Sequence, residues 1–401
     1  MIYDKRGLAL LFAANIFIST IFYSTYVFIP LFIRSLGASV FEVGIVLFIS
    51  NASATFTMIL GGYLSDKYGR RKVIVLSGVA PLITPLLFMS AQRWFETIIY
   101  ASLNIISVSL FVSSRAAMII DLSNRESAGE VFGLMNTAWP IGGLIGPLIG
   151  GLVVDNYGWN FFFYFICTLA ALYMLIILFL PESTKRFYEA DMEKVKFSIR
   201  QVASPLAFFI ILHIIANMSI GALSTIFPFY LTEQFGKTET EVGIFFSAGM
   251  GLANLISQPS SGFLSDKIGR KKTMVFSVLP IPILYMLFTV TNDYLLSLLV
   301  YMGIYGLWSA TWPASNMYIA EIFPHGKRGL AVGIRLTSVR LGTTIGPLMG
   351  GFLWDNFDIH IVFHFLAAFM TMALLMALML KDESKFVNSR LSPQVQKGGL
   401  K

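Results

Sequence analysis

The stretch GYLSDKYGRRK at residues 62–72 recurs as GFLSDKIGRKK at residues 262–272. Each copy joins glycines, a carboxylate and a cluster of basic residues, and each lies between two long apolar segments. The same offset of 200 residues relates GPLIGGLVVDN at 146–156 to GPLMGGFLWDN at 346–356. The chain is therefore an internal duplication, and its two halves are expected to fold alike.

The amino-acid composition of the chain is unusual for a water-soluble protein. Of the 401 residues, 56% are apolar and only 13% are charged, whereas a soluble domain usually carries about 25% charged residues. The single cysteine, Cys167, excludes a disulfide framework within the chain and a cysteine-cluster metal site. The composition thus disfavours a soluble enzyme, a secreted scaffold and a nucleic-acid-binding protein.

Twelve apolar segments are long enough to cross a membrane as helices, which takes about 20 residues each. We predict spans at 8–33, 41–64, 73–91, 96–119, 130–153, 159–181, 204–231, 241–264, 273–291, 294–320, 328–353 and 359–380. The predicted fold class is an all-α membrane protein with twelve transmembrane helices in two pseudo-symmetric six-helix bundles. The bundles occupy residues 1–181 and 204–380, a cytoplasmic linker occupies 182–203, and a cytoplasmic tail occupies 381–401. No signal peptide is expected.

The basic residues predict the orientation. If the N-terminus is cytoplasmic, 23 of the 29 lysines and arginines fall on the cytoplasmic side, three fall in outer loops and three fall inside spans. This bias follows the positive-inside rule and predicts a cell-membrane protein with both termini in the cytoplasm. The net charge of +7 then belongs to a membrane face, so no nucleic-acid partner is expected.

The doubled loop motif, G-x-x-x-D-K-x-G-R-[RK]-K after the second span of each half, resembles the major facilitator superfamily. The resemblance covers spans 1 to 12 and implies a transporter in which such loops latch the cytoplasmic side. Gly62 and Gly262 would allow close helix packing, and Gly69 and Gly269 would suit a tight turn. The implied latch comprises Gly62, Asp66, Gly69, Arg70, Asp121, Gly262, Asp266, Gly269, Arg270 and Glu321. Arg70 and Arg270 can form ion pairs with the acids at the ends of spans 4 and 10. The alternative is that these residues anchor the loops to lipid headgroups and have no latch role.

The glycine-proline run of span 5 resembles a motif of the drug-efflux branch, but span 11 carries it too. Small residues also let membrane helices pack closely, so function and packing are hard to separate here. The residues of this helix-packing motif are Gly142, Gly146, Pro147, Gly150, Gly151, Gly342, Gly346 and Pro347.

In that family, spans 1, 4, 7 and 10 line the substrate cavity. Our candidates for it are polar and aromatic residues of those spans, together with the three arginines inside spans: Asn15, Tyr26, Asn104, Phe111, Arg115, His213, Asn217, Tyr305, Trp308, Trp312, Arg335 and Arg340. His213 could carry a coupling proton, because imidazole titrates near neutral pH, or could be a simple polar contact. The aromatic run at 161–164 is expected to face lipid.

No acid falls in the middle of a predicted span, and span 1 lacks the carboxylate that many proton-coupled members carry. A central arginine costs about 2.5–3.5 kcal/mol on insertion scales, so such residues usually face the bundle interior or a water-filled cavity. An unpaired cationic cavity would suit an anionic substrate. The alternative is that Arg115 and Arg335 reach the headgroups, which is harder for the deeper Arg340.

The leading hypothesis is a secondary active transporter that moves a small amphiphilic, anionic molecule by alternating access, as in drug efflux. The alternatives are uptake or exchange of a small organic anion and, from another class, a transporter-like membrane sensor. An enzyme is not expected, and no cofactor or metal site is predicted. The expected partners are the lipid bilayer, a small-molecule substrate and a coupling proton or ion, with the protein a monomer.

Overall fold

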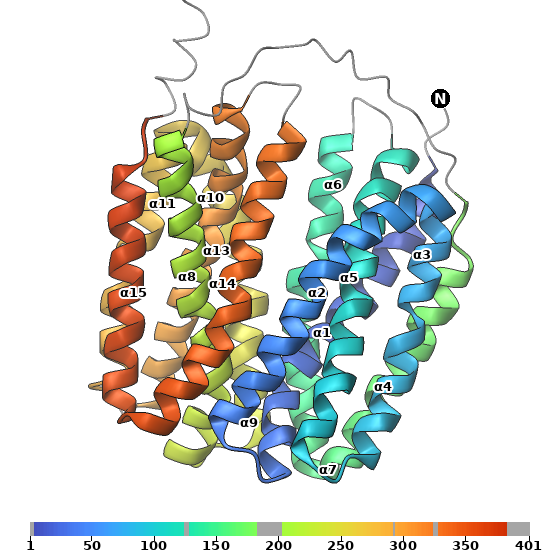
Figure 1. Ribbon diagram of the computed structural model, residues 1–401, viewed down its shortest axis with the longest axis horizontal. Helices are drawn as coiled ribbons and strands as arrows, with labels where there is room; N and C mark the ends of the chain where they lie inside the picture. The colour runs from blue at the N-terminus through green and yellow to red at the C-terminus, as the bar shows by residue number, and fades with distance from the viewer. Residues whose placement is uncertain (1–3, 124–127, 183–202, 292, 324–327, 383–401) are drawn as a thin grey trace, which may run out of the picture. The chain divides into compact units, whose positions relative to one another are not determined.

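The computed structural model of the chain describes residues 4–123, 128–182, 203–291, 293–323 and 328–382. All regular elements in these residues are helices (Figure 1). The first half contains α1 (Lys5–Ser35), α2 (Val40–Tyr68), α3 (Arg70–Ser77), α4 (Val79–Ser90), η1 (Trp94–Glu96), α5 (Thr97–Leu122), α6 (Ala128–Asn136) and α7 (Ala138–Leu178).

The second half repeats this series with two π-helical turns, η3 and η4, inserted in it. It contains α8 (Ala203–Phe229), η3 (Tyr230–Gln234), α9 (Glu239–Phe246), η4 (Ser247–Ala253), α10 (Asn254–Ile268), α11 (Arg270–Val278), α12 (Ile281–Leu287), α13 (Tyr294–Ile322), α14 (Arg328–Asn356) and α15 (Ile359–Met379). Each of the twelve predicted spans coincides with helical residues.

Eight helical segments among the described residues are long and apolar enough to cross a membrane. One of them, Glu130–Leu178, contains two predicted spans and is 49 residues long. It is broken at Gly158, whose φ of +82° lies in the left-handed region that favours glycine. This break lies between the predicted spans 130–153 and 159–181, so their separation is confirmed.

Contacts divide the described chain into two compact units. Unit 1 comprises the described residues of Met1–Phe187, Gly221–Leu255 and Thr344–Phe357, and unit 2 comprises those of Tyr188–Ile220, Ile256–Thr343 and Asp358–Lys401. Unit 1 therefore includes all of α9 and parts of α8, α10 and α14, which belong to the second sequence half. The predicted bundles, 1–181 and 204–380, follow the sequence repeat. They stay a prediction, because the contacts of the described residues group the helices into different units.

An aromatic cluster forms part of the core of unit 1. Phe163 of α7 stacks on Phe88 with ring centroids 5.6 Å apart, and its edge meets Phe32 of α1 at 4.9 Å. Phe162 packs edge-on against Phe28 at 5.6 Å. The prediction that the run at 161–164 faces lipid is therefore wrong for Phe162 and Phe163, which are buried, whereas its outer two residues are exposed. One helical turn places neighbouring residues on different faces.

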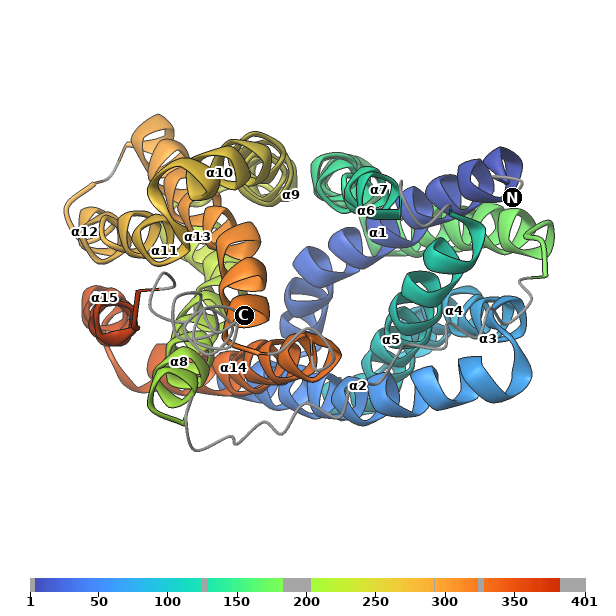
Figure 2. The same cartoon turned by 90° about the horizontal axis from the view of Figure 1, so that it is seen from above.

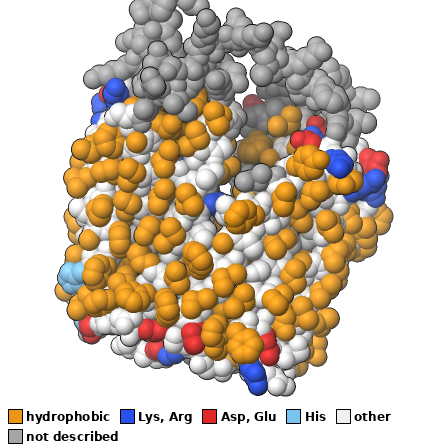
Figure 3. Space-filling model, in the orientation of Figure 1, with side chains coloured by type: hydrophobic (Ala, Val, Ile, Leu, Met, Phe, Trp, Pro, Cys, Tyr) orange, Lys and Arg blue, Asp and Glu red, His pale blue; other side chains and the backbone are white. Residues whose placement is uncertain are grey.

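In unit 2, α11 and α12 pack against both α13 and α15, and Figure 2 shows α11, α12 and α15 close to end-on. On the face drawn in Figure 3, hydrophobic side chains are spread over the whole described surface, and the charged side chains gather mainly near its two ends. Large apolar side chains such as Phe56, Phe263 and Val290 are exposed in the structure. An apolar surface this extensive is unusual in water and is expected of helices surrounded by lipid.

Candidate functional site

The loop motif of unit 1 is built around Arg70, the first residue of α3. Its Nη1 donates to the Asp66 carboxylate at 2.6 Å and to the Ser65 carbonyl at 2.8 Å. Its Nε lies 3.3 Å from Oδ2 of Asp121, near the end of α5. Gly69, with φ +100°, makes the turn between α2 and α3. The guanidinium thus ties the ends of α2 and α5 together.

Unit 2 contains the same arrangement around Arg270. Its Nη2 lies 3.3 Å from Asp266, and its Nε lies 3.2 Å from Glu321 at the end of α13. Gly269 repeats the turn with φ +98°. The glycines at 69 and 269 therefore have the turn conformation expected of them, and the two arginines lie beside the expected acids. The latch role of these groups stays a prediction.

Gly62 and Gly262 do not have the close packing that we expected. Among the described residues, no atom lies within 4 Å of the position that a Cβ on Gly62 would take, and a Cβ on Gly262 would meet only Pro313 at 4.0 Å. The close approach is made by Gly61, whose Cβ would meet the Ser113 side chain of α5 at 2.5 Å. The reason is the helical period, because neighbouring residues point about 100° apart and only one of them faces α5.

The glycine-proline runs are contact faces within the units. In unit 1, Gly142 and Gly146 of α7 approach Ser19 and Thr20 of α1, and a Cβ on Gly146 would lie 2.6 Å from the Thr20 carbonyl oxygen. In unit 2, Gly342 of α14 approaches Ile214 and Asn217 of α8. Four further glycines of the runs pack as follows: Gly150 against Phe28, Gly350 against Ala222, Gly151 against Glu239 and Gly351 against Val40.

The predicted cavity residues of unit 1 include a buried polar cluster. Arg115 of α5 is 5% exposed, and its Nη2 donates to Oδ1 of Asn136 at 2.9 Å. The neighbouring Met135 carbonyl accepts from Nδ2 of Asn15 at 2.6 Å, which links α1 to this cluster. Within the described residues, Arg115 takes part in no ion pair, and its Nε and Nη1 have no hydrogen-bond partner.

Tyr26 and Asn104 lie at a small apolar cavity of unit 1. Tyr26 and Ser224 of α8 share a hydrogen bond of 2.6 Å between their hydroxyls. The cavity is lined by Phe22, Thr25, Tyr26, Ile29, Leu47, Phe88, Ala101, Asn104 and Ile105. Its volume of about 30 Å³ is room for about two water molecules, so it is too small for a drug-sized ligand.

The structure corrects the prediction that Phe111 lines the substrate cavity. Its side chain is fully buried and packs edge-on against Tyr173 of α7, with ring centroids 5.9 Å apart. Sequence spacing alone placed it beside Asn104 and Arg115. A 3.6-residue period leaves the exact edge of a helix face undetermined, and the neighbouring helix decides it.

Unit 2 brings four predicted cavity residues together. Arg335 of α14 is 3% exposed, its Nε donates to the Ser315 hydroxyl at 2.9 Å, and its Cζ lies 5.3 Å from the ring of Trp312. His213 of α8 is buried, with its ring 6.4 Å from that of Trp308. Nδ1 of His213 donates to the Phe209 carbonyl at 2.9 Å, because a carbonyl can only accept.

The other predicted residues of unit 2 lie around this group. Asn217 is buried and donates to the His213 carbonyl at 2.7 Å. Tyr305 is buried with its ring 4.6 Å from that of Tyr301. Arg340 is half-buried. The three arginines therefore do not form one described group, since Arg115 belongs to unit 1 and the other two belong to unit 2.

Sequence reasoning missed two groups. Phe22, Tyr23 and Trp139 form an aromatic cluster with Tyr26, with ring centroids 5.2 to 6.1 Å apart. Ser315, the partner of Arg335, was missed although the repeat contains a signal for it. Position 315 is the counterpart of Arg115, and position 335 is the counterpart of Met135. In the first half the arginine lies on α5 and its partner Asn136 lies on α6. In the second half the arginine lies on α14 and its partner Ser315 lies on α13, the counterpart of α5.

The described residues contain no group of three or more histidines, cysteines or acids that could hold a metal ion. The polar side chains described above bind one another without any arrangement typical of a nucleophile and its base. Their chemistry is that of recognition: buried guanidinium groups, indole rings and neutral hydrogen-bonding side chains.

Comparison with known proteins assigns the family. The family model described as Major Facilitator Superfamily matches residues 11–236 and 209–399. The multidrug resistance protein MdtG of Proteus mirabilis is 28% identical over 359 residues, which cover 85% of this chain and 87% of that protein. The multi-drug resistance efflux pump PmrA of Streptococcus pneumoniae is 26% identical over 352 residues, covering 84% and 86%. The solved structure of the nucleoside transporter NupG matches with a TM-score of 0.78 at 14% identity, covering 94% of this chain and 100% of that chain.

These matches agree with the helical architecture and with the repeated loop motif. The protein is a multi-pass membrane transporter that acts on a small molecule, and it is not an enzyme. Because the family model covers almost the whole length in two overlapping matches, the chain belongs to the Major Facilitator Superfamily.

Proposed function

We propose that this protein exports small amphiphilic molecules that carry a negative charge, as a secondary active transporter working by alternating access. The relatives that bear multidrug-resistance and efflux names support export. The distribution of lysine and arginine supports a cell-membrane location with both termini and both loop motifs in the cytoplasm. A coupling proton or ion would drive the transport.

The observation that carries this proposal is the environment of Arg335. A buried guanidinium normally has a carboxylate partner, because an unpaired buried charge is costly. Arg335 instead bonds the neutral Ser315 and lies beside the indole of Trp312, which is 41% exposed. A cation next to an open aromatic surface favours a ligand that combines a carboxylate, sulfonate or phosphate with an apolar ring.

Arg115 supports the same charge preference independently. It is buried within unit 1, and its hydrogen bond runs to the neutral amide of Asn136. Both units thus contain an arginine without an acidic partner among the described residues. A site for organic cations would be expected to contain buried carboxylates, and the predicted spans contain no acid near their centres.

The charge preference can be tested with three ligands that share one ring system: 2-naphthoate, 2-(aminomethyl)naphthalene and 2-naphthalenemethanol. In thermal-shift titrations of purified protein, the anion should stabilise the folded state most. Arg335→Gln should weaken its binding by about tenfold or more, the size of a lost charge-assisted hydrogen bond, and Arg335→Lys should retain part of it. Trp312→Ala should weaken the binding of all three ligands, because each carries the same aromatic ring system.

Two outcomes would contradict the proposal. Preferential stabilisation by the amine, unchanged in Arg335→Gln, would make the arginine structural and would favour a cationic substrate. Protein in liposomes that accumulates 2-naphthoate without exporting it would favour uptake or exchange of organic anions instead.

We further propose that the two loop motifs form the cytoplasmic latch of the transport cycle. Asp66→Asn removes one ion-pair partner of Arg70 and should shift the population toward the inward-open state. Because Asp66 is exposed, we expect a change of about two- to fivefold in the rate at which cysteines introduced on the two membrane faces are modified. Asp293→Asn is the matched control, since the Asp293 carboxylate caps its own helix through Leu296 N at 2.7 Å and lies outside both loop motifs. Equal rates in parent and Asp66→Asn would contradict the latch.

A further inference from the structure

Two repeated stretches play no part in the function proposed above. They are the acids that end the glycine-proline runs, Asp155 and Asp355, and the Glu-Val-Gly turns at 42–44 and 241–243. In the structure these stretches meet at one end of unit 1. It is the end where α2 begins, about 43 Å from the loop motif at 1.5 Å per residue over its 29 residues. We call it the distal end.

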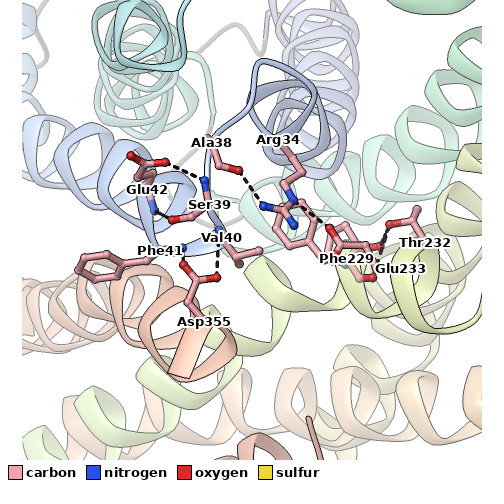
Figure 4. A network of polar contacts seen from close by, with 11 residues as sticks. Arg34, Ala38, Ser39, Val40, Phe41, Glu42, Phe229, Thr232, Glu233 and Asp355 are labelled. Carbon is pink, nitrogen blue, oxygen red and sulfur yellow. Dashed lines mark hydrogen bonds and ion pairs between the residues drawn. The ribbon is translucent and has the colours of Figure 1, made fainter. Parts of the chain in front are cut away.

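Asp355 completes the N-terminus of α2. A helix leaves four backbone N–H groups at its start without partners inside the helix. Ser39 and Glu42 satisfy two of them reciprocally, with Ser39 N bonding Glu42 Oε2 at 2.7 Å and Glu42 N bonding Ser39 Oγ at 3.2 Å. The two N–H groups that remain, Val40 and Phe41, donate to the Asp355 carboxylate at 3.3 and 2.9 Å (Figure 4).

The other copy of the repeat has a matching contact. Thr238 and Glu241 cap α9 reciprocally, at 3.0 and 3.3 Å. Asp155 Oδ2 accepts a hydrogen bond of 2.7 Å from the hydroxyl of Thr240, the repeat counterpart of Phe41. Each carboxylate therefore binds the first turn of a helix from the other half of the sequence.

Glycines bring the backbones close enough for these contacts. A Cβ on Gly351 would collide with the Val40 carbonyl, and a Cβ on Gly151 would collide with that of Glu239. A Cβ on Gly44 would lie 2.6 Å from the Pro347 carbonyl. The ion pair of Arg34 with Glu233, at 2.9 Å, also joins the two halves, but both side chains are more than a third exposed and contribute little.

We propose that Asp155 and Asp355 are a repeat-related pair of positioning residues that hold the distal end of unit 1 closed. Each adds a negative charge and a hydrogen bond at the positive N-terminus of a helix, an interaction that weakens when the halves separate. The pair would set how readily a transporter of the proposed mechanism opens at this end. The inference rests on alternating access, but it concerns conformation and not substrate.

Distances between spin labels on the two halves measure closure directly. The background carries Cys167→Ser, and the labels are attached through Ser35→Cys and Gln234→Cys, at two exposed positions of the distal end. Asp155→Asn and Asp355→Asn should each lower the ratio of short to long distances by about two- to fivefold, the size of a charge–helix interaction. The double variant should lower it by about tenfold, since separate contacts add.

Asp358→Asn is the matched control. It removes the same charge three residues from Asp355, but Asp358 caps its own helix through His360 N at 2.9 Å and has no other hydrogen-bond partner among the described residues outside that helix. It should leave the ratio unchanged. If the double variant fails to fold, the single variants and Thr240→Val test the same contacts, and each should shift the ratio in the same direction.

Unchanged distances in both single variants would overturn the inference, as would an equal shift in Asp358→Asn. Neither result would bear on the proposed substrate, because the measurement needs no ligand. Conversely, if 2-naphthoate does not bind, the distance shifts still decide whether these carboxylates hold the distal end closed.

Discussion

Asp121→Asn is expected to lower the free energy of unfolding by about 3 kcal/mol, because breaking a buried ion pair leaves the other charge uncompensated. The side chains of Asp121 and Arg70 are only 7% and 12% exposed, and their closest charged atoms are 3.3 Å apart. Asp66 also contacts Arg70, but it is exposed to water and cannot replace the buried charge. Unfolding in mixed detergent micelles, followed by helical circular dichroism, measures the loss.

The internal repeat supplies the control for this prediction. Glu321 forms the equivalent pair with Arg270 at 3.2 Å, but these side chains are 22% and 21% exposed. Solvent screens that pair more strongly, so Glu321→Gln should lower the free energy of unfolding by about 1 kcal/mol. Equal losses in the two variants would show that burial does not distinguish the two copies.

Gly146→Ala is expected to lower the free energy of unfolding by about 1–3 kcal/mol, the usual effect of overpacking. The added methyl group would lie 2.6 Å from the Thr20 carbonyl and 3.0 Å from the Ser24 hydroxyl of α1. The first of these is a backbone atom that cannot move aside by changing a rotamer. The nearby hydrogen bond from Ser19 to the Ala138 carbonyl, at 2.9 Å, also fixes the spacing of α1 and α7.

Gly133→Ala makes the same chemical change without the clash. Gly133 lies in α6, and among the described residues no atom comes within 4 Å of its Cβ position. Alanine favours a helix interior over glycine by about 0.5–1 kcal/mol, so this variant should be as stable as the parent or more stable. A loss of stability in Gly133→Ala equal to that in Gly146→Ala would remove the packing explanation.

The broad architecture was predictable from sequence because its signals are local or repeated. Apolar length marks the spans, and the offset of 200 residues pairs Arg70 with Arg270 and Gly69 with Gly269. The turn glycines have positive φ in both copies because the chain reverses tightly there, a requirement that acts within a few residues. Such features do not depend on which helix lies opposite.

Contacts between helices were less predictable. Asn15, Arg115 and Arg335 are buried as a membrane interior requires of polar groups, yet their partners Met135, Asn136 and Ser315 were not predicted. Phe162 and Phe163 were predicted to face lipid but are buried in protein, because an apolar stripe does not reveal whether lipid or protein covers it. Lipid and a protein core both accept the same side chains.

Hydropathy and internal repetition are properties of the chain, so they predicted a duplicated membrane protein of twelve spans without any tertiary information. The transporter role followed from the resemblance of the loop motif to the family. Tertiary structure alone decided that Gly61 rather than Gly62 faces α5, and that Asp355 caps α2 from 314 and 315 residues away. A helix face is fixed only by the neighbour that packs on it. A carboxylate finds its helix terminus only when two distant segments have already come together.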